Sequence, residues 1–146
     1  MSKMMEGKVV VVTGAGRGIG RDMALLMAAE GAAVVVNDLG VSVDGSVSTE
    51  TPAAEVVREI ESRGGRAVAN GESVSDWTAA GRIVQCAMDT FGRIDAVVNN
   101  AGILRDRFFF NMSLEEWRAV IDVHLNGTFY VSRAAAPHFK AQNSGA

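Results

Sequence analysis

Four glycines fall within seven positions directly behind an apolar run, in the stretch VVVVTGAGRGIG of residues 9–20. The apolar run, the glycines and the helical pattern that follows predict a buried strand that turns sharply into a helix. Such a corner aims unpaired backbone N–H groups and the positive end of the helix dipole at one place, which suits a pyrophosphate. The turn therefore predicts a phosphate site, and a tight corner without a ligand is the alternative.

The spacing of the glycines narrows this prediction. Gly14, Gly18 and Gly20 follow Thr13 in the pattern T-G-x-x-x-G-x-G, whereas Ile19 breaks the pattern G-x-G-x-x-G. Glycine is required where the backbone takes positive φ, or where a Cβ would collide with a ligand or a neighbouring strand.

An acidic residue, Asp38, ends the next apolar run. A carboxylate at this point can accept hydrogen bonds from the ribose hydroxyls of adenosine, and a role as turn former alone is the alternative. The 2′-phosphate of NADP would meet Asp38 with a repulsion of roughly a few kcal/mol at an effective dielectric of about 20. NAD is therefore favoured over NADP, although Arg17 in the glycine turn could attract that phosphate.

Strand-like and helix-like stretches alternate along the chain. The strand-like runs are short, β-branched and apolar on both faces, as expected of central parallel strands covered by helices on both sides: 8–13, 32–38, 66–70 and 93–100. The pattern predicts an α/β fold with a Rossmann-type doubly wound parallel sheet, of which 146 residues supply the first four strands and their helices.

Local signals punctuate the helices. Thr51-Pro52 fits a cap and first helical position, and Gly64-Gly65 closes that helix. Ser113 and Glu116 have capping-box spacing and open a long amphipathic helix, whose apolar residues are Trp117, Val120, Ile121, Val123 and Leu125. The glycine-rich loop 39–49 is expected to be mobile or to bind a ligand.

Composition excludes several classes of function. The net charge of −3 gives no electrostatic footprint for a nucleic acid or a membrane surface. Cys86 is the single cysteine and is expected in the core; without Cys/His pairs at ligand spacing we expect no metal site. No secretory signal or apolar span is evident in the sequence, so the default location is cytoplasmic.

The motif TGAGRGIG at residues 13–20, together with Asn99-Asn100-Ala101-Gly102, resembles the short-chain dehydrogenase/reductase family over essentially the whole chain. Within that family, stretches such as FGRIDAVVNNAGILRDR are similar to the (3R)-hydroxyacyl-CoA dehydrogenase part of peroxisomal multifunctional β-oxidation enzymes. The resemblance implies a contact with each part of a dinucleotide cofactor. At the adenosine end, Asp38 would bind the ribose, and Ser73 and Val74 the adenine. The pyrophosphate would be held by Gly14, Arg17, Gly18 and Ile19, and the nicotinamide-side ribose by Asn100, Ala101, Gly102 and Ile103. It also implies that Gly20 allows close helix packing and that Asn99 ties adjacent strands together.

The family's catalytic serine and Tyr-x-x-x-Lys pair have no counterpart in these residues. Tyr130 is the single tyrosine, and Ala134 stands four positions later. The resemblance implies that both motifs follow residue 146, after a fifth strand. We therefore expect residues 1–146 to form a dinucleotide-binding domain, incomplete at its C-terminus and inactive by itself, with an uncovered edge on the fourth strand.

His124 stands where the family carries a helix-borne catalytic asparagine. One interpretation is structural, a histidine hydrogen-bonded near the cleft. The other is a proton relay, because imidazole titrates near neutrality.

Other residues near the expected cleft allow two interpretations each. Arg105 and Arg107 either meet an anionic substrate such as an acyl-CoA or form a solvated pair, and Phe108–Phe110 are expected to divide between the core, a subunit contact and substrate. The resemblance implies that the helix from Leu114 builds contacts in a homo-oligomer.

These observations favour an oxidoreductase that transfers hydride between NAD and a secondary alcohol or ketone, with a 3-hydroxyacyl thioester as the expected substrate. The alternatives are a catalytically inert nucleotide-binding module and a methyltransferase of related fold.

Overall fold

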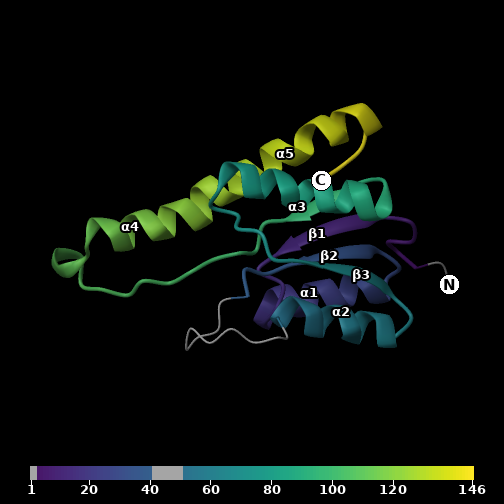
Figure 1. Cartoon of the computed structure of the whole chain (residues 1–146), viewed down its shortest axis with the longest axis horizontal. Helices are drawn as coiled ribbons and strands as arrows, with labels where there is room; N and C mark the ends of the chain where they lie inside the picture. Colours follow the sequence, from purple (N-terminus) through teal and green to yellow (C-terminus); the bar gives the residue numbers. More distant parts are fainter. Residues whose placement is uncertain (1–2, 41–50) are drawn as a thin grey trace.

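The computed structural model describes residues 3–40 and 51–146 and has an α/β fold (Figure 1). Within these residues four parallel strands form one sheet in the order β3-β2-β1-β4, with β1 Val9–Thr13, β2 Ala33–Asn37, β3 Arg66–Asn70 and β4 Ala96–Val98. This arrangement confirms the predicted Rossmann-type sheet. Of the glycine-rich loop 39–49, residues 41–49 lie outside the described residues.

Helices cover both faces of the sheet, as Figure 1 shows. Alternate residues of β1 and β2 face opposite sides: Val9 and Val11 belong to one core cluster, and Val10 and Val12 to the other. The first cluster packs against α3 Trp77–Phe91 and α5 Gly127–Gln142, and the second against α1 Gly18–Ala29 and α2 Pro52–Ser62. β1 and β2 are buried along their whole length, because helices cover both of their faces. The expectation of a strand covered on both faces fails at β3, the edge strand, where Arg66 and Ala69 are exposed.

The local helix signals have their expected structural effect. The side chain of Thr51 accepts a hydrogen bond from the Ala54 N–H at the start of α2. Ser113 and Glu116 form a reciprocal capping box at the start of α4 Leu114–Ile121. Cys86 is half-buried and packs against the core cluster of α3 and α5.

The long helix predicted from residue 114 is interrupted by a π-helical turn, η2 Asp122–Asn126, between α4 and α5. Figure 1 shows α4 extending away from the sheet. Trp117 and Leu125 consequently remain more than half exposed, at 53% and 64%. The amphipathic pattern therefore predicted the helix correctly, but this chain covers only part of its apolar side chains: Val123 packs against the core cluster, whereas Trp117 and Leu125 stay exposed.

Of the places expected for Phe108–Phe110, the core of this chain is wrong, whereas a subunit contact and a substrate contact stay predictions. The three side chains are 76%, 90% and 83% exposed, and the short 3-10 helix η1 Phe109–Asn111 contains two of them. They lie on the segment that leads from β4 to α4, which leaves the sheet before turning into the helix (Figure 1).

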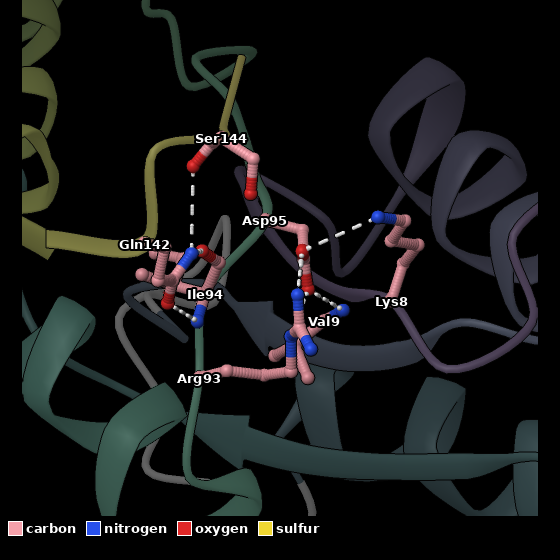
Figure 2. Close-up of polar contacts among 7 residues, drawn as sticks. All are labelled: Lys8, Val9, Arg93, Ile94, Asp95, Gln142 and Ser144. Carbon is pink, nitrogen blue, oxygen red and sulfur yellow. Dashed lines mark hydrogen bonds and ion pairs between the residues drawn. The ribbon is translucent and has the colours of Figure 1, made fainter. Parts of the chain in front are cut away.

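The strand predicted over 93–100 is shorter in the structure, where β4 covers only Ala96–Val98. Side-chain hydrogen bonds replace strand pairing on both sides of it. At its beginning, the nearly buried carboxylate of Asp95 accepts hydrogen bonds from the Val9 N–H at 2.9 Å and from Arg93 Nε and Nη2 at 2.8 and 2.6 Å (Figure 2). Lys8 Nζ lies 3.7 Å from the same carboxylate. This Asp95 cluster joins the amino ends of β1 and β4.

The outer edge of β4 also has a partner, contrary to the expected uncovered edge. Ala146 donates its N–H to the Asp95 carbonyl, and its carbonyl accepts from the Val97 N–H, at 3.0 and 2.9 Å. The amide of Gln142 donates to the Ile94 carbonyl at 2.7 Å and accepts from the Ile94 N–H at 3.3 Å (Figure 2). These contacts hold the end of α5 against the beginning of β4.

The Asp95 cluster predicts a pH-dependent contribution to stability. Burial by itself raises the pKa of Asp95, but the hydrogen bonds from Arg93 and from the Val9 N–H, with the nearby positive charges, outweigh it and hold the pKa below its ordinary value. Asp95→Asn should lower the free energy of unfolding at neutral pH by about 2 kcal/mol. The stabilisation exists above the ordinary aspartate pKa of about 3.9 and is lost as pH falls through the lower folded-state pKa.

Urea unfolding of the wild type and Asp95→Asn, at neutral pH and near pH 3, measures the two free energies of unfolding. The difference between them should be smaller at the lower pH. Asp89→Asn, at an exposed position of α3, is the matched control and should change stability by no more than about 0.5 kcal/mol. If the free energies of unfolding of the wild type and Asp95→Asn differ by the same amount at both pH values, the ionised Asp95 carboxylate is not the source of the stabilisation.

Candidate cofactor-binding site

The glycine turn and the N-N-A-G segment meet at the carboxyl end of the sheet. Gly14 has φ of +62°, and a Cβ on it would lie 2.8 Å from the Ala101 Cα. A Cβ on Gly20 would overlap the Gly14 carbonyl oxygen, so this position of α1 packs directly on the turn. Both positions therefore require glycine for the chain to follow this path.

The buried hydroxyl of Thr13 joins the two motifs. Thr13 Oγ1 accepts hydrogen bonds from the N–H groups of Asn100 and Ala101, at 3.2 and 3.1 Å, and donates to the Val98 carbonyl at 3.3 Å. The Asn100 side-chain amide donates to the carbonyls of Thr13 and Gly14, both at 3.1 Å. The end of β1 is thus tied to the end of β4 by side chains and backbone together.

The assignment of the strand-joining role to Asn99 is wrong. The Asn99 side-chain amide donates to Ser132 Oγ of α5 at 3.0 Å, whereas Asn100 joins β4 to β1. Neighbouring residues point in opposite directions at the end of a strand, and the sequence does not say which of two adjacent asparagines faces the neighbouring strand.

Asp38 stands at the end of β2, next to the glycine turn. One carboxylate oxygen accepts from the Gly16 N–H and the other from the Gly40 N–H, each at 3.0 Å. Asp38 therefore does form a turn, and it also fixes the position of the glycine segment. Each carboxylate oxygen has a second acceptor position, which is the capacity that a ribose hydroxyl needs.

The beginning of α1 differs from those of α2, α3 and α4. Arg17 occupies the N-cap position and makes no side-chain hydrogen bond to the helix, whereas Thr51, Asp76 and Ser113 cap α2, α3 and α4. Arg17 and Gly18 are exposed, and so is Ile19, at 69%. The first N–H groups of a helix have no partner within the helix, so this end can bind an anion.

A cleft of about 480 Å³ lies at the carboxyl ends of the strands. Its lining includes seven residues of the predicted site, namely Gly14, Asp38, Ser73, Val74, Ala101, Gly102 and Ile103. The remaining predicted residues do not line it: Arg17, Gly18 and Ile19 stand at the beginning of α1, Asn100 in the strand contact, and His124 on η2. The volume is within the range of small-molecule sites.

Residues that sequence reasoning missed complete the lining: Asn37, Leu39, Glu72, Ser75 and Val123. Asn37 and Glu72 could have been found by inspecting the end of every strand, because the carboxyl ends of parallel strands share one edge. A hydrogen bond from Arg82 lowers the pKa of Glu72, with a smaller opposing effect of burial. Glu72 borders the same cleft as Asp38, and both of its carboxylate oxygens are bound by Arg82.

Ser73 and Val74 occupy different environments. Ser73 Oγ is exposed, contacts Ser75 Oγ at 2.9 Å and accepts from the Ser75 N–H. Val74 is 8% exposed and packs into the core near Gly127, where an added Cβ would lie 2.9 Å from its Cγ2.

The two arginines after β4 also lie in different environments. Arg105 lines the cleft and donates to the Leu104 carbonyl at 2.9 Å. Arg107 donates to Glu116 of the capping box at 2.9 Å. Of the two, Arg105 is thus the one placed to meet a ligand in the cleft.

Among residues 3–40 and 51–146, no group of three or more His, Cys, Asp or Glu side chains could hold a metal ion. No helix within these ranges is long and apolar enough to cross a membrane.

The fold, the glycine turn and the N-N-A-G contact define a class of protein. Residues 8–146 match the family model described as short chain dehydrogenase, and the chain belongs to this family.

Particular relatives agree with this assignment. Peroxisomal multifunctional enzyme type 2 of Mus musculus is 54% identical over 140 residues, 96% of this chain and 19% of the mouse protein. Hydroxyacyl-CoA dehydrogenase ChsB1 of Mycobacterium tuberculosis is 46% identical, over 93% of this chain and 41% of that protein. A crystal structure of a short chain dehydrogenase from Mycobacterium avium superimposes with a TM-score of 0.88 at 54% identity, over 95% of this chain and 48% of that one. The chain therefore spans at most about half the length of these proteins.

The Thr13 contact generates a prediction for stability. Thr13→Val keeps the shape of the side chain but leaves two backbone N–H groups without their acceptor. The free energy of unfolding should fall by about 1–3 kcal/mol. Urea unfolding measures the loss, with Thr90→Val at an exposed position of α3 as the matched control. Equal effects of the two substitutions would contradict the role of the Thr13 hydroxyl.

Proposed function

We propose that this chain is the dinucleotide-binding part of an NAD-dependent oxidoreductase of the short-chain dehydrogenase family. The observation that carries the proposal is the corner where β1 meets α1, with uncapped helix amides on one side and Asp38 on the other. Family membership supports a nicotinamide dinucleotide as the ligand, and the cleft runs from this corner along the ends of the strands.

Each part of the dinucleotide has a proposed contact. The amides at the beginning of α1 and of the turn would hold the pyrophosphate, through Gly14, Arg17, Gly18 and Ile19. Asp38 would bind the adenosine ribose, Ser73 and Val74 the adenine, and Asn100, Ala101, Gly102 and Ile103 the nicotinamide-side ribose. When bound, the nicotinamide supplies the hydride acceptor or donor, and the chain's own residues bind and orient it.

The proposed substrate is a secondary alcohol or ketone, and specifically a 3-hydroxyacyl thioester. The similarity to a hydroxyacyl-CoA dehydrogenase supports this class. Arg105 in the lining of the cleft is a cation that could meet the phosphates of an acyl-CoA.

A second candidate function is an inert nucleotide-binding module. Tyr130 favours it for this chain, because the ring stacks edge-on against Trp77 at 5.3 Å and lies outside the lining of the cleft. No other tyrosine is present in the sequence to act as the general acid or base. We therefore propose that residues 1–146 form a dinucleotide-binding domain that needs further catalytic groups for turnover.

Exposed apolar side chains support a homo-oligomer as the complete form. Trp117, Leu125 and Phe129 lie along α4, η2 and α5 and are each more than half exposed. The single cysteine is the basis for proposing a reducing compartment such as the cytoplasm.

Titration with the two dinucleotides tests the cofactor. NAD should bind the purified chain about tenfold or more tightly than NADP, because the 2′-phosphate would face the Asp38 carboxylate. Asp38→Asn should narrow this preference, and Asp89→Asn on α3 should leave it unchanged. Calorimetry or tryptophan fluorescence supplies the affinities. Tighter binding of NADP would overturn the role of Asp38, and failure to bind either dinucleotide would overturn the proposed cofactor.

An activity assay separates binding from catalysis. With NAD and a 3-hydroxyacyl thioester, the purified 146-residue chain should form no NADH above the uncatalysed background, because no tyrosine borders the cleft. Absorbance of NADH measures the product. Enzyme-dependent formation of NADH would show that another group supplies the general acid or base.

A further inference from the structure

Asn37 lies at the end of β2, between the glycine turn and the segment that follows β3. The residue is only 2% exposed, yet it lines the cleft. Its carbonyl accepts from the Ala15 N–H at 2.9 Å, so the glycine turn fixes the backbone at this point. Asn37 is therefore a buried polar residue of the cleft to which the proposed cofactor contacts assign no role.

The side-chain amide of Asn37 is held in one orientation. Its Nδ2 donates to Asn70 Oδ1 at 2.8 Å and to the Glu72 carbonyl at 2.9 Å, which engages both amide hydrogens. Asn70 Oδ1 also accepts from the Glu72 N–H at 3.0 Å, so this atom is an oxygen. Turning the Asn37 amide over would set its own oxygen against two acceptors, and the network therefore fixes which atom of the amide is the nitrogen.

The oxygen of the same amide has unused acceptor positions. Within residues 3–40 and 51–146 no hydrogen bond reaches Asn37 Oδ1. No fully buried side-chain nitrogen or oxygen of the described residues lacks a partner, so Oδ1 must keep some contact with solvent. Asn37 is otherwise enclosed and lines the cleft, so the cleft is the space that this oxygen faces. A hydrogen-bond donor of a ligand can bind there.

The position of this oxygen indicates which donor it can bind. Adenosine offers two kinds of strong donor, the ribose hydroxyls and the 6-amino group of adenine. Neighbouring side chains of a strand point to opposite sides, so Asn37 does not face the group that Asp38 would bind. The Asn37 amide is bonded to Glu72, directly before Ser73 and Val74, the residues proposed to bind the adenine. The 6-amino group is thus the donor that fits.

We propose that Asn37 selects adenine in this cleft: its Oδ1 accepts a hydrogen bond from the 6-amino group, and the bonds of its Nδ2 to Asn70 and Glu72 hold the amide in the orientation that this requires. A base with an oxygen at position 6, such as hypoxanthine, would set that oxygen against Oδ1. The amide cannot turn over to donate without breaking both of its bonds, so the wrong base leaves two acceptors facing each other. The inference rests on the proposed function for its ligand and adds the group that recognises the base.

Binding of NAD and of nicotinamide hypoxanthine dinucleotide to the 146-residue chain tests this selection. The two ligands differ only in the base, and the wild type should bind NAD about tenfold or more tightly. Asn37→Leu keeps the approximate size of the side chain but removes the acceptor, so the ratio of the two affinities should fall by about threefold or more. The same substitution at an exposed asparagine just after β4, Asn99→Leu, is the matched control and should keep the wild-type ratio. Calorimetry supplies the affinities, and their ratio separates selection of the base from a general loss of structure.

Nuclear magnetic resonance of the wild type tests the contact without depending on the folding of a variant. In a chain labelled with carbon-13 at the asparagine side-chain carbonyls, the Asn37 Cγ signal should move when AMP saturates the chain and should move less with IMP. Nicotinamide mononucleotide, which has no adenine, should leave the signal unchanged. The Nδ2 hydrogens should exchange slowly with solvent in the free chain, because both are bonded to Asn70 and Glu72.

The outcomes separate this proposal from the proposed function. If the wild type binds both dinucleotides equally, if Asn37→Leu keeps the wild-type ratio, or if saturating AMP leaves Asn37 Cγ unchanged, the role of Asn37 is wrong and the proposed cofactor stands. If the wild type binds neither dinucleotide, the proposed cofactor is wrong and the selection of adenine fails with it.

Discussion

The hydroxyl of Thr13 is the contact on which the architecture of the cleft depends. It holds the backbone of Asn100 and Ala101 at the end of β1, so that the glycine turn and the N-N-A-G segment meet. β2 and β4 lie on opposite sides of β1, and the chain therefore leaves the sheet in opposite directions at this point. Such a switch in strand order opens a crevice at the carboxyl ends of the strands. The requirement for glycine at position 14 follows, because any side chain there would meet Ala101.

The polar groups at the two ends of the sheet differ in whether they are paired within the chain. At the amino ends, the Asp95 carboxylate is satisfied by Arg93, Lys8 and the Val9 N–H, and the cluster joins β1 to β4. At the carboxyl ends, the amides at the beginning of α1 have no side-chain cap. A satisfied buried ion cluster stabilises the fold, whereas unpaired amides remain available for an anion. The π-helical turn that carries His124 lies on this second side, and such turns are frequent at functional sites.

Much of the fold was predictable because its signals are local. The apolar runs predicted β1 and β2 to within about one residue at each end, since strands covered on both faces need side chains that can be buried throughout. The cap at Thr51 follows from its neighbour Pro52, and the capping box at Ser113 from a glutamate three positions later. The meeting of the glycine turn with Asp38 was also predictable, because parallel strands place their carboxyl ends at one edge.

The sequence by itself determined the elements, their order and the chemistry of the corner, because each depends on neighbouring residues or on a general rule of parallel sheets. Only the tertiary structure decided that Asn100 rather than Asn99 faces β1, in a contact between residues 87 positions apart. It also decided that Glu72 lines the cleft and that His124 contacts both polar atoms of Ile103. These outcomes depend on directions and distances between elements remote in sequence, and a pattern of residue types carries no information on them.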